Sequence, residues 1–115
     1  MTAPATPDAL PLIRDVLARL CPDDVPVADR GRFETAVFAV TADIVEHASA
    51  RRARVTLDVT LRCGRGGLSA EIDENGEARR DTADLPAAEI ADEVRYDRRG
   101  GRNRWLITCA LTRRA

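Results

Sequence analysis

Two polar side chains within one long apolar run are the residues of this sequence best placed to do chemistry. Asp43 and His47 lie four residues apart in the run from Phe33 to Ala48, and Ala39 lies four residues before Asp43. Residues at this spacing stack on one face of an α-helix, so the run is predicted to form a long buried helix. A carboxylate and an imidazole there indicate a site. The alternatives are a solvated helix face for Asp43 and a helix-end histidine for His47.

The stripe resembles the nucleotide-binding helix of the histidine-kinase-type ATPase fold (GHKL), in the branch of the anti-sigma-factor serine kinases. In that family the stripe reads Glu, then Asn, then His-Ala. The corresponding residues here are Ala39, Asp43 and His47-Ala48. The likeness extends from about Arg32 to Leu111.

The family's second motif, Asp-x-Gly-x-Gly, follows a strand, and this chain has Glu74-Asn75-Gly76-Glu77-Ala78 after a predicted strand. Glu74 replaces the aspartate, unless Asp73 serves in a shifted register, and Ala78 replaces the second glycine. Asn-Gly is also the commonest pair in two-residue hairpin turns, so a plain turn is the alternative.

The resemblance implies a site for Mg-ATP that is weak or absent. Asp43 takes the place of the family's metal-holding asparagine, and a carboxylate is a hard oxygen ligand for Mg²⁺. Glu74 or Asp73 would accept a hydrogen bond from the adenine amino group, and Gly76 would let the backbone approach the ligand. His47 and Asn75 complete the implied nucleotide site.

Two departures from the family pattern argue against phosphoryl transfer. Ala39 occupies the position of the family's general base, and its side chain cannot exchange a proton. The stretch Ala78 to Ala88 corresponds to the family's glycine-rich lid but contains no glycine. Backbone amides that cradle phosphates are what such a lid supplies, so tight triphosphate binding is not expected.

The elements that must position these residues follow from periodicity. Helices are predicted at Asp8–Leu20, at Asp29–Ala50 with Asp29 as N-cap, and in a short segment capped by Asp84. Alternating patterns predict strands, and they fall at Arg54–Arg62, Leu68–Asp73, Val94–Asp97 and Arg104–Thr112.

This element order predicts an α+β fold. It is a two-layer sandwich in which a mostly antiparallel mixed sheet is covered on one face by two or three helices, as in the GHKL ATPases. Residues 1–8 are expected to be a disordered lead-in, and residues 9–115 a single domain of ordinary size.

Composition restricts the function classes. The chain of 115 residues has a net charge of −1 and only 3% aromatic residues, which argues against direct nucleic-acid binding through its Arg-rich strand edges. No apolar run is long enough to span a bilayer, and no secretory signal is apparent, so a cytoplasmic location without membrane contact is expected.

The three cysteines, Cys21, Cys63 and Cys109, are far apart and form no CxxC pair, which favours neither a metal frame nor a disulfide scaffold. Buried reduced thiols are therefore expected. A reactive thiol at Cys63, which lies beside two arginines in sequence, is the weaker alternative.

The leading functional hypothesis is a regulatory protein-binding module with a degenerate anti-sigma-kinase-like fold and no kinase activity. Its expected partner is a sigma factor or an anti-sigma antagonist, and a homodimer is common in the resembling family. The alternative is a weak Mg-ATP-binding serine protein kinase of the anti-sigma type.

Overall fold

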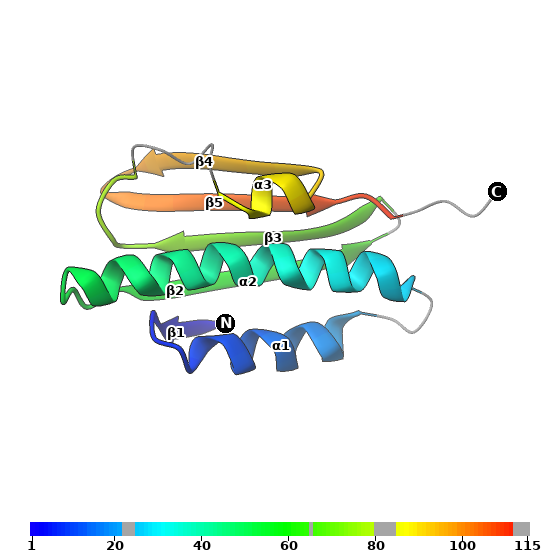
Figure 1. The fold of residues 1–115 in the computed structure, drawn as a ribbon, viewed down its shortest axis with the longest axis horizontal. Coiled ribbons are helices and arrows are strands. Elements are labelled where there is room, and N and C mark those ends of the chain that lie inside the picture. The colour runs from blue at the N-terminus through cyan, green and yellow to red at the C-terminus, as the bar shows by residue number, and fades with distance from the viewer. Residues whose placement is uncertain (22–24, 65, 80–84, 112–115) are drawn as a thin grey trace.

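The computed structural model describes residues 1–21, 25–64, 66–79 and 85–111, which form one sheet with helices packed on one of its faces (Figure 1). In chain order the elements are β1 (Thr2–Pro4), α1 (Ala9–Leu20), α2 (Val27–Ala50), β2 (Thr56–Gly64), β3 (Gly67–Glu74), α3 (Ala87–Ile90), β4 (Glu93–Arg99) and β5 (Arg102–Cys109). The predicted two-layer α+β sandwich is confirmed.

The sheet has the strand order β1-β2-β3-β5-β4, and every pairing between its described strands is antiparallel. The predicted hairpin of β2 and β3 is present, with Cys63 opposite Leu68. β1 and β4 are the two edge strands of the open sheet. β1 has three residues, and β4 carries mostly charged residues.

The disordered lead-in expected at residues 1–8 is wrong at Thr2–Pro4, which pair with β2 and place Ala3 opposite Leu57. The backbone groups along the outer edge of β2 need partners, and a short extended segment supplies them. Three residues are too few to show a periodic pattern, so the sequence carried no signal for this strand.

The helical layer is built around α2, which lies along the sheet with α1 beside it and α3 near β4 (Figure 1). Asp29, predicted as the N-cap of this helix, lies within its first turn, because the extended backbone of Pro26 sets the helix start earlier. A carboxylate in a first turn still faces the positive end of the helix dipole favourably.

The core between the two layers is aliphatic apart from two aromatic side chains, in keeping with the composition. Its largest fully buried apolar residues are Trp105, Phe33, Ile13, Leu17, Ile44, Leu57, Leu68, Ile72, Ile107, Val37 and Val40. The inward positions of β2, β3 and β5 were predicted correctly for Leu57, Ile72 and Trp105. The opposite sheet face is mostly polar, apart from residues such as Leu106.

The predicted helix cap at Asp84 and the predicted strand end at Thr112 lie outside the described residues. Within the part of the chain that the structure describes, no helix is both long enough and apolar enough to cross a membrane.

Candidate functional site

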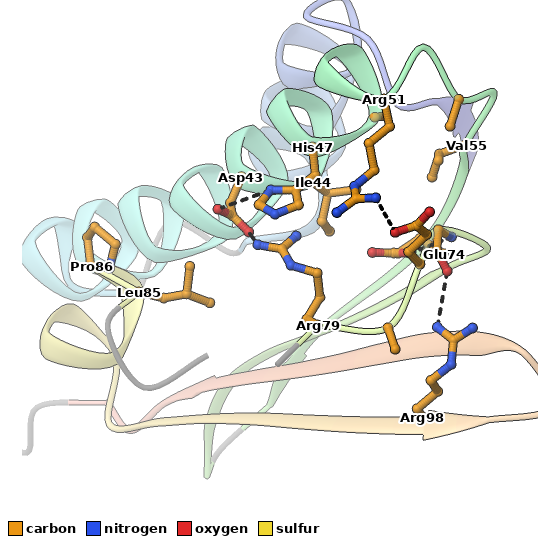
Figure 2. Close-up of a pocket in the computed structure, with 15 residues that line it drawn as sticks. Asp43, Ile44, His47, Arg51, Val55, Glu74, Arg79, Leu85, Pro86 and Arg98 are labelled. Carbon is orange, nitrogen blue, oxygen red and sulfur yellow. Dashed lines mark hydrogen bonds and ion pairs between the residues drawn. The ribbon is translucent and has the colours of Figure 1, made fainter. Parts of the chain in front are cut away.

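A cleft of about 940 Å³ opens between the C-terminal half of α2 and the chain that follows β3 (Figure 2). Its apolar surface comes from residues such as Ile44, Val55 and Leu85, and charged side chains line the rest. A volume of this size is typical of pockets that hold small ligands. The helix α2 and the bend at Gly76, which are far apart in sequence, therefore line the same cleft.

An ion pair spans this cleft. The Nη2 group of Arg79 donates a hydrogen bond to Asp43 on α2, and Nδ1 of His47 lies 3.9 Å from the other carboxylate oxygen of Asp43 (Figure 2). The Asp43 carboxylate is thus held by a guanidinium and bordered by an imidazole. A cation supplied by the chain itself compensates its charge.

The Arg79 side chain is only 9% exposed, and its guanidinium carbon lies 5.6 Å from the centre of the Trp105 ring. This distance permits a cation–π contact. Among the described residues, no atom accepts a hydrogen bond from Nη1 of Arg79, although that atom is buried. A buried donor without a partner is costly, so Nη1 stands out among the buried side-chain atoms of the described residues.

Aromatic and amide groups of β4 and β5 hold Arg79 in place. Its backbone N–H donates to the Tyr96 hydroxyl at 2.9 Å, and that hydroxyl donates to Oδ1 of Asn103. The Tyr96 and Trp105 rings pack with centroids 4.8 Å apart. The position of Arg79 therefore depends on strands that follow it in the chain.

Glu74, at the end of β3, is 2% exposed and directed into the protein. Its Oε1 accepts hydrogen bonds from the Gly76 N–H at 2.7 Å and from Nδ2 of Asn103 at 2.9 Å, and its Oε2 lies 3.4 Å from Nε1 of Trp105. A buried carboxylate is tolerated only with such donors. Glu74 consequently has its acceptors engaged by the protein.

Gly76 has a steric reason to be glycine. A Cβ atom at this position would lie 2.8 Å from Oε1 of Glu74, closer than real Cβ contacts. The rim of the cleft beside it is tied by Arg98, which donates to the Gly76 carbonyl at 3.1 Å (Figure 2). A more exposed ion pair joins Arg51 and Glu77 at 2.6 Å.

Of the six residues predicted to form the site, Asp43, His47, Glu74 and Gly76 line the cleft. The other two do not. Asp73 alternates with Glu74 along β3, so it lies on the open face of the sheet, where it pairs with Arg102. The shifted register would require Asp73 to face the cleft, and its side chain does not line it.

Asn75 serves the backbone, because its Oδ1 accepts a hydrogen bond from the Thr56 N–H at 2.8 Å. The alternative prediction of a plain Asn-Gly hairpin turn is also wrong. The next strand in the chain is β4, which pairs with β5 and not with β3.

Sequence reasoning missed Arg79, Tyr96 and Asn103. Arg79 lies in a stretch without periodicity and gave no signal. Asn103 did give one: it shares the inward parity of Trp105, Ile107 and Cys109, so it is a polar residue in an apolar position. Such a residue indicates a buried partner, here Glu74.

Within the described parts of the chain, no three or more His, Cys, Asp or Glu side chains gather where they could hold a metal ion. Asp43 has the His47 imidazole beside it but is not part of such a group, and its binding of Mg²⁺ stays a prediction. Neither the protein-family models nor the curated proteins gave a match to this chain.

Proposed function

We propose that this chain is a regulatory protein-binding module with a degenerate anti-sigma-kinase-like fold, and that it does not transfer phosphate. The observation that carries the proposal is the ion pair of Arg79 with Asp43. On the resemblance, Asp43 stands where the metal-holding asparagine belongs. A guanidinium now neutralises that carboxylate, so the charge that a divalent cation would satisfy is already balanced.

The state of Glu74 supports the same conclusion. The family's adenine contact needs a carboxylate oxygen that faces the cleft with a free lone pair. Both oxygens of Glu74 instead face donors from the protein, and the residue is almost fully buried. Ala39 adds no proton acceptor on the helix. The cleft retains the shape of a ligand site while its polar groups serve the fold.

A protein of this kind acts by presenting its surface to a partner. The partner class that the resemblance implies is a sigma factor or an anti-sigma antagonist, and binding is expected to be independent of nucleotide. A direct test measures binding of the purified chain to purified proteins of these two classes from the same organism, with and without Mg-ATP. Nucleotide-independent binding to one of them supports the proposal, whereas partner phosphorylation that requires Mg-ATP and this chain overturns it.

The absence of a nucleotide requirement can be tested on the chain alone. Millimolar Mg-ATP is expected to leave its melting temperature unchanged, because a ligand raises stability by RT ln(1 + [L]/Kd) only if it binds the native state. A variant that combines Ala39→Glu, Asp43→Asn, Ala78→Gly and Arg79→Ala restores the family residues and removes the competing guanidinium. A Mg-ATP-dependent rise in this variant but not in the wild type is the expected result.

The alternative function is a weak Mg-ATP-binding serine protein kinase of the anti-sigma type. Two observations favour it: the cleft is large enough for a nucleotide, and Nη1 of Arg79 has no acceptor among the described residues. In this case Mg²⁺ and Arg79 compete for Asp43, so Arg79→Ala should strengthen metal-dependent binding while Arg51→Ala, at the exposed rim, should not. A rise in wild-type melting temperature with Mg-ATP that EDTA abolishes would establish this alternative.

A further inference from the structure

The cleft beside α2 has more hydrogen-bond donors than the protein uses. Three guanidinium groups line it, those of Arg51, Arg79 and Arg98, and they come from three separate parts of the chain (Figure 2). A guanidinium carries five N–H donors in a planar fork. The acceptors that the described residues supply occupy only part of each fork, so the cleft can offer the remaining donors to a ligand.

Arg79 shows this surplus most clearly. Its side chain is 9% exposed and reaches across the cleft toward α2, where Nη2 donates to Asp43 (Figure 2). The Nη1 group is buried and has no acceptor among the described residues. A buried donor of a charged group is costly when it has no acceptor, and a ligand oxygen beside Nη1 would remove that cost. The geometry of Arg79 therefore favours an acceptor brought by a ligand.

The other two guanidiniums lie at the rim and are also partly used. The Nη1 group of Arg98 donates to the Gly76 carbonyl at 3.1 Å and to Oδ1 of Asn103 at 2.8 Å, and the described residues supply no ion pair to this arginine. Both acceptors are neutral groups. Arg51 contacts Glu77 through Nη1 alone, at 2.6 Å. Each arginine therefore keeps donors for an anion that enters the cleft.

The acidic residues of the cleft limit the charge of such an anion. Asp43 and Glu77 each pair with one of the arginines, and Glu74 takes neutral donors. Three arginines and three acidic residues line the cleft, so its net charge is zero when His47 is neutral. A polyphosphate would place several charges beside these carboxylates, whereas a single negative charge can be held by the unused donors. A monoanion therefore fits the cleft better than a triphosphate does.

The apolar part of the wall indicates what the anion is attached to. It includes Ile44 and Ala48 of α2, Val55 before β2, and Leu85 and Pro86 before α3. Ligand sites commonly combine such a wall, which removes hydrocarbon from water, with a few polar groups that fix the head of the ligand. The cleft volume of about 940 Å³ is larger than a carboxylate alone would fill. The ligand should therefore carry an apolar body.

We propose that this cleft binds a small organic acid with one carboxylate and an apolar body, and that it does so without a metal ion. Nη1 of Arg79 donates to the carboxylate, and the guanidiniums of Arg51 and Arg98 attract it at the rim. Nη2 of Arg79 keeps its bond to Asp43, so no cation is needed to balance that residue. This inference goes beyond the protein-binding role and does not depend on which partner the chain binds.

The test uses octanoate as the probe, below the concentration at which it forms micelles. Acetate supplies the charged head without the body, and 1-octanol supplies the body without the charge. The full chain is titrated in EDTA and followed by amide NMR and melting temperature. Octanoate is expected to shift the amides of Ala48, Ala53 and Gly76, which line the cleft, and to raise the melting temperature. The two control compounds should bind at least roughly tenfold more weakly.

Substitutions of arginine identify the donors. Arg79→Lys keeps the charge but loses the fork, and it should weaken octanoate binding roughly tenfold. Arg98→Gln at the rim should weaken it about two- to threefold. Arg95→Gln is the matched control, because Arg95 is an exposed arginine of β4 that pairs with Glu93 and does not line the cleft. The direction expected at Arg79 is opposite to that for Mg-ATP, whose binding should improve when this arginine is removed.

Four outcomes would overturn the proposal: no binding at millimolar octanoate, binding that EDTA abolishes, 1-octanol that binds as well as octanoate, or an Arg79→Lys variant that binds octanoate as the wild type does. Circular dichroism shows whether Arg79→Lys folds. If it does not, the wild-type amide shifts decide, since shifts confined to residues outside the cleft would also overturn the proposal. Partner binding is measured separately, so failure here leaves the protein-binding proposal standing.

Discussion

The two halves of α2 meet the same sheet in different ways. In the N-terminal half, Phe33, Ala36 and Val37 are at most 1% exposed and belong to the apolar core. In the C-terminal half, Ile44 still reaches the core, but Asp43 and its neighbours overlook a cleft. One continuous helix thus serves as a dry packing surface at one end and as the wall of a polar site at the other.

The two halves differ in the interactions that fix the positions of their side chains. Apolar packing is non-directional and tolerates many neighbours of suitable volume. The polar end depends on directional bonds, in which Asp43, Glu74 and Asn103 each have specific partners from elements distant in sequence. Substitutions should therefore cost most at the dry end, while at the polar end their effects should depend on which partner is lost.

The largest effect is expected from Phe33→Ala at the dry end. Removing a fully buried aromatic side chain leaves a cavity that a close-packed interior cannot fill, which costs about 3–5 kcal/mol. Urea unfolding followed by circular dichroism measures this loss. Leu12→Ala on the exposed side of α1 is the control and should change stability little, and a Phe33→Ala loss below that of the polar-end variants would contradict the comparison.

An intermediate effect is expected from Glu74→Ala at the polar end. The Gly76 N–H and the Trp105 indole lose their acceptor, and the Asn103 amide keeps only the Glu77 carbonyl. Buried donors left without partners cost roughly 1–3 kcal/mol. The same unfolding experiment applies, with Trp105 fluorescence as a local probe. Glu71→Ala, on the open face of the same strand, is the matched control; equal losses at both positions would show that the buried network contributes nothing.

The smallest effect is expected in the coupling energies of two ion pairs that line the cleft. A double-mutant cycle with Arg79→Ala and Asp43→Ala should give a coupling of about 1–2 kcal/mol, because the guanidinium is buried and its charge cannot be satisfied by water. The same cycle on the exposed pair of Arg51 and Glu77 should give under ~0.5 kcal/mol. Coupling of equal size in both cycles would show that burial does not distinguish them.

Most of the fold could be predicted because period and burial agree along the main elements. The alternation of Leu57 and Val59 in β2 and of Trp105 and Ile107 in β5 identified the inward face, since one sheet face packs on helices and the other meets water. β1 was not predicted, because this segment is extended through its pairing with β2, and its three residues show no alternation of apolar and polar side chains.

The site was predicted only in part, for a related reason. Asp43 and His47 were found because helical spacing alone brings them to one face. Arg79 was not, since its place depends on Tyr96 and Trp105 from later strands, and no local pattern encodes that contact. The sequence left Glu74 and Asp73 as alternatives, because the register at the end of a strand decides which of two adjacent carboxylates points inward.

The edges of the sheet limit how this protein can self-associate. β4 carries Glu93, Arg95, Asp97, Arg98 and Arg99 within seven residues, and β1 is three residues long and ends in a proline that lacks an N–H. Neither edge is a good template for a strand from another copy, because charge and missing donors oppose continued pairing. If two copies do assemble, they should meet through helices or through the open polar face, and the sheet should not run on from one subunit into the next.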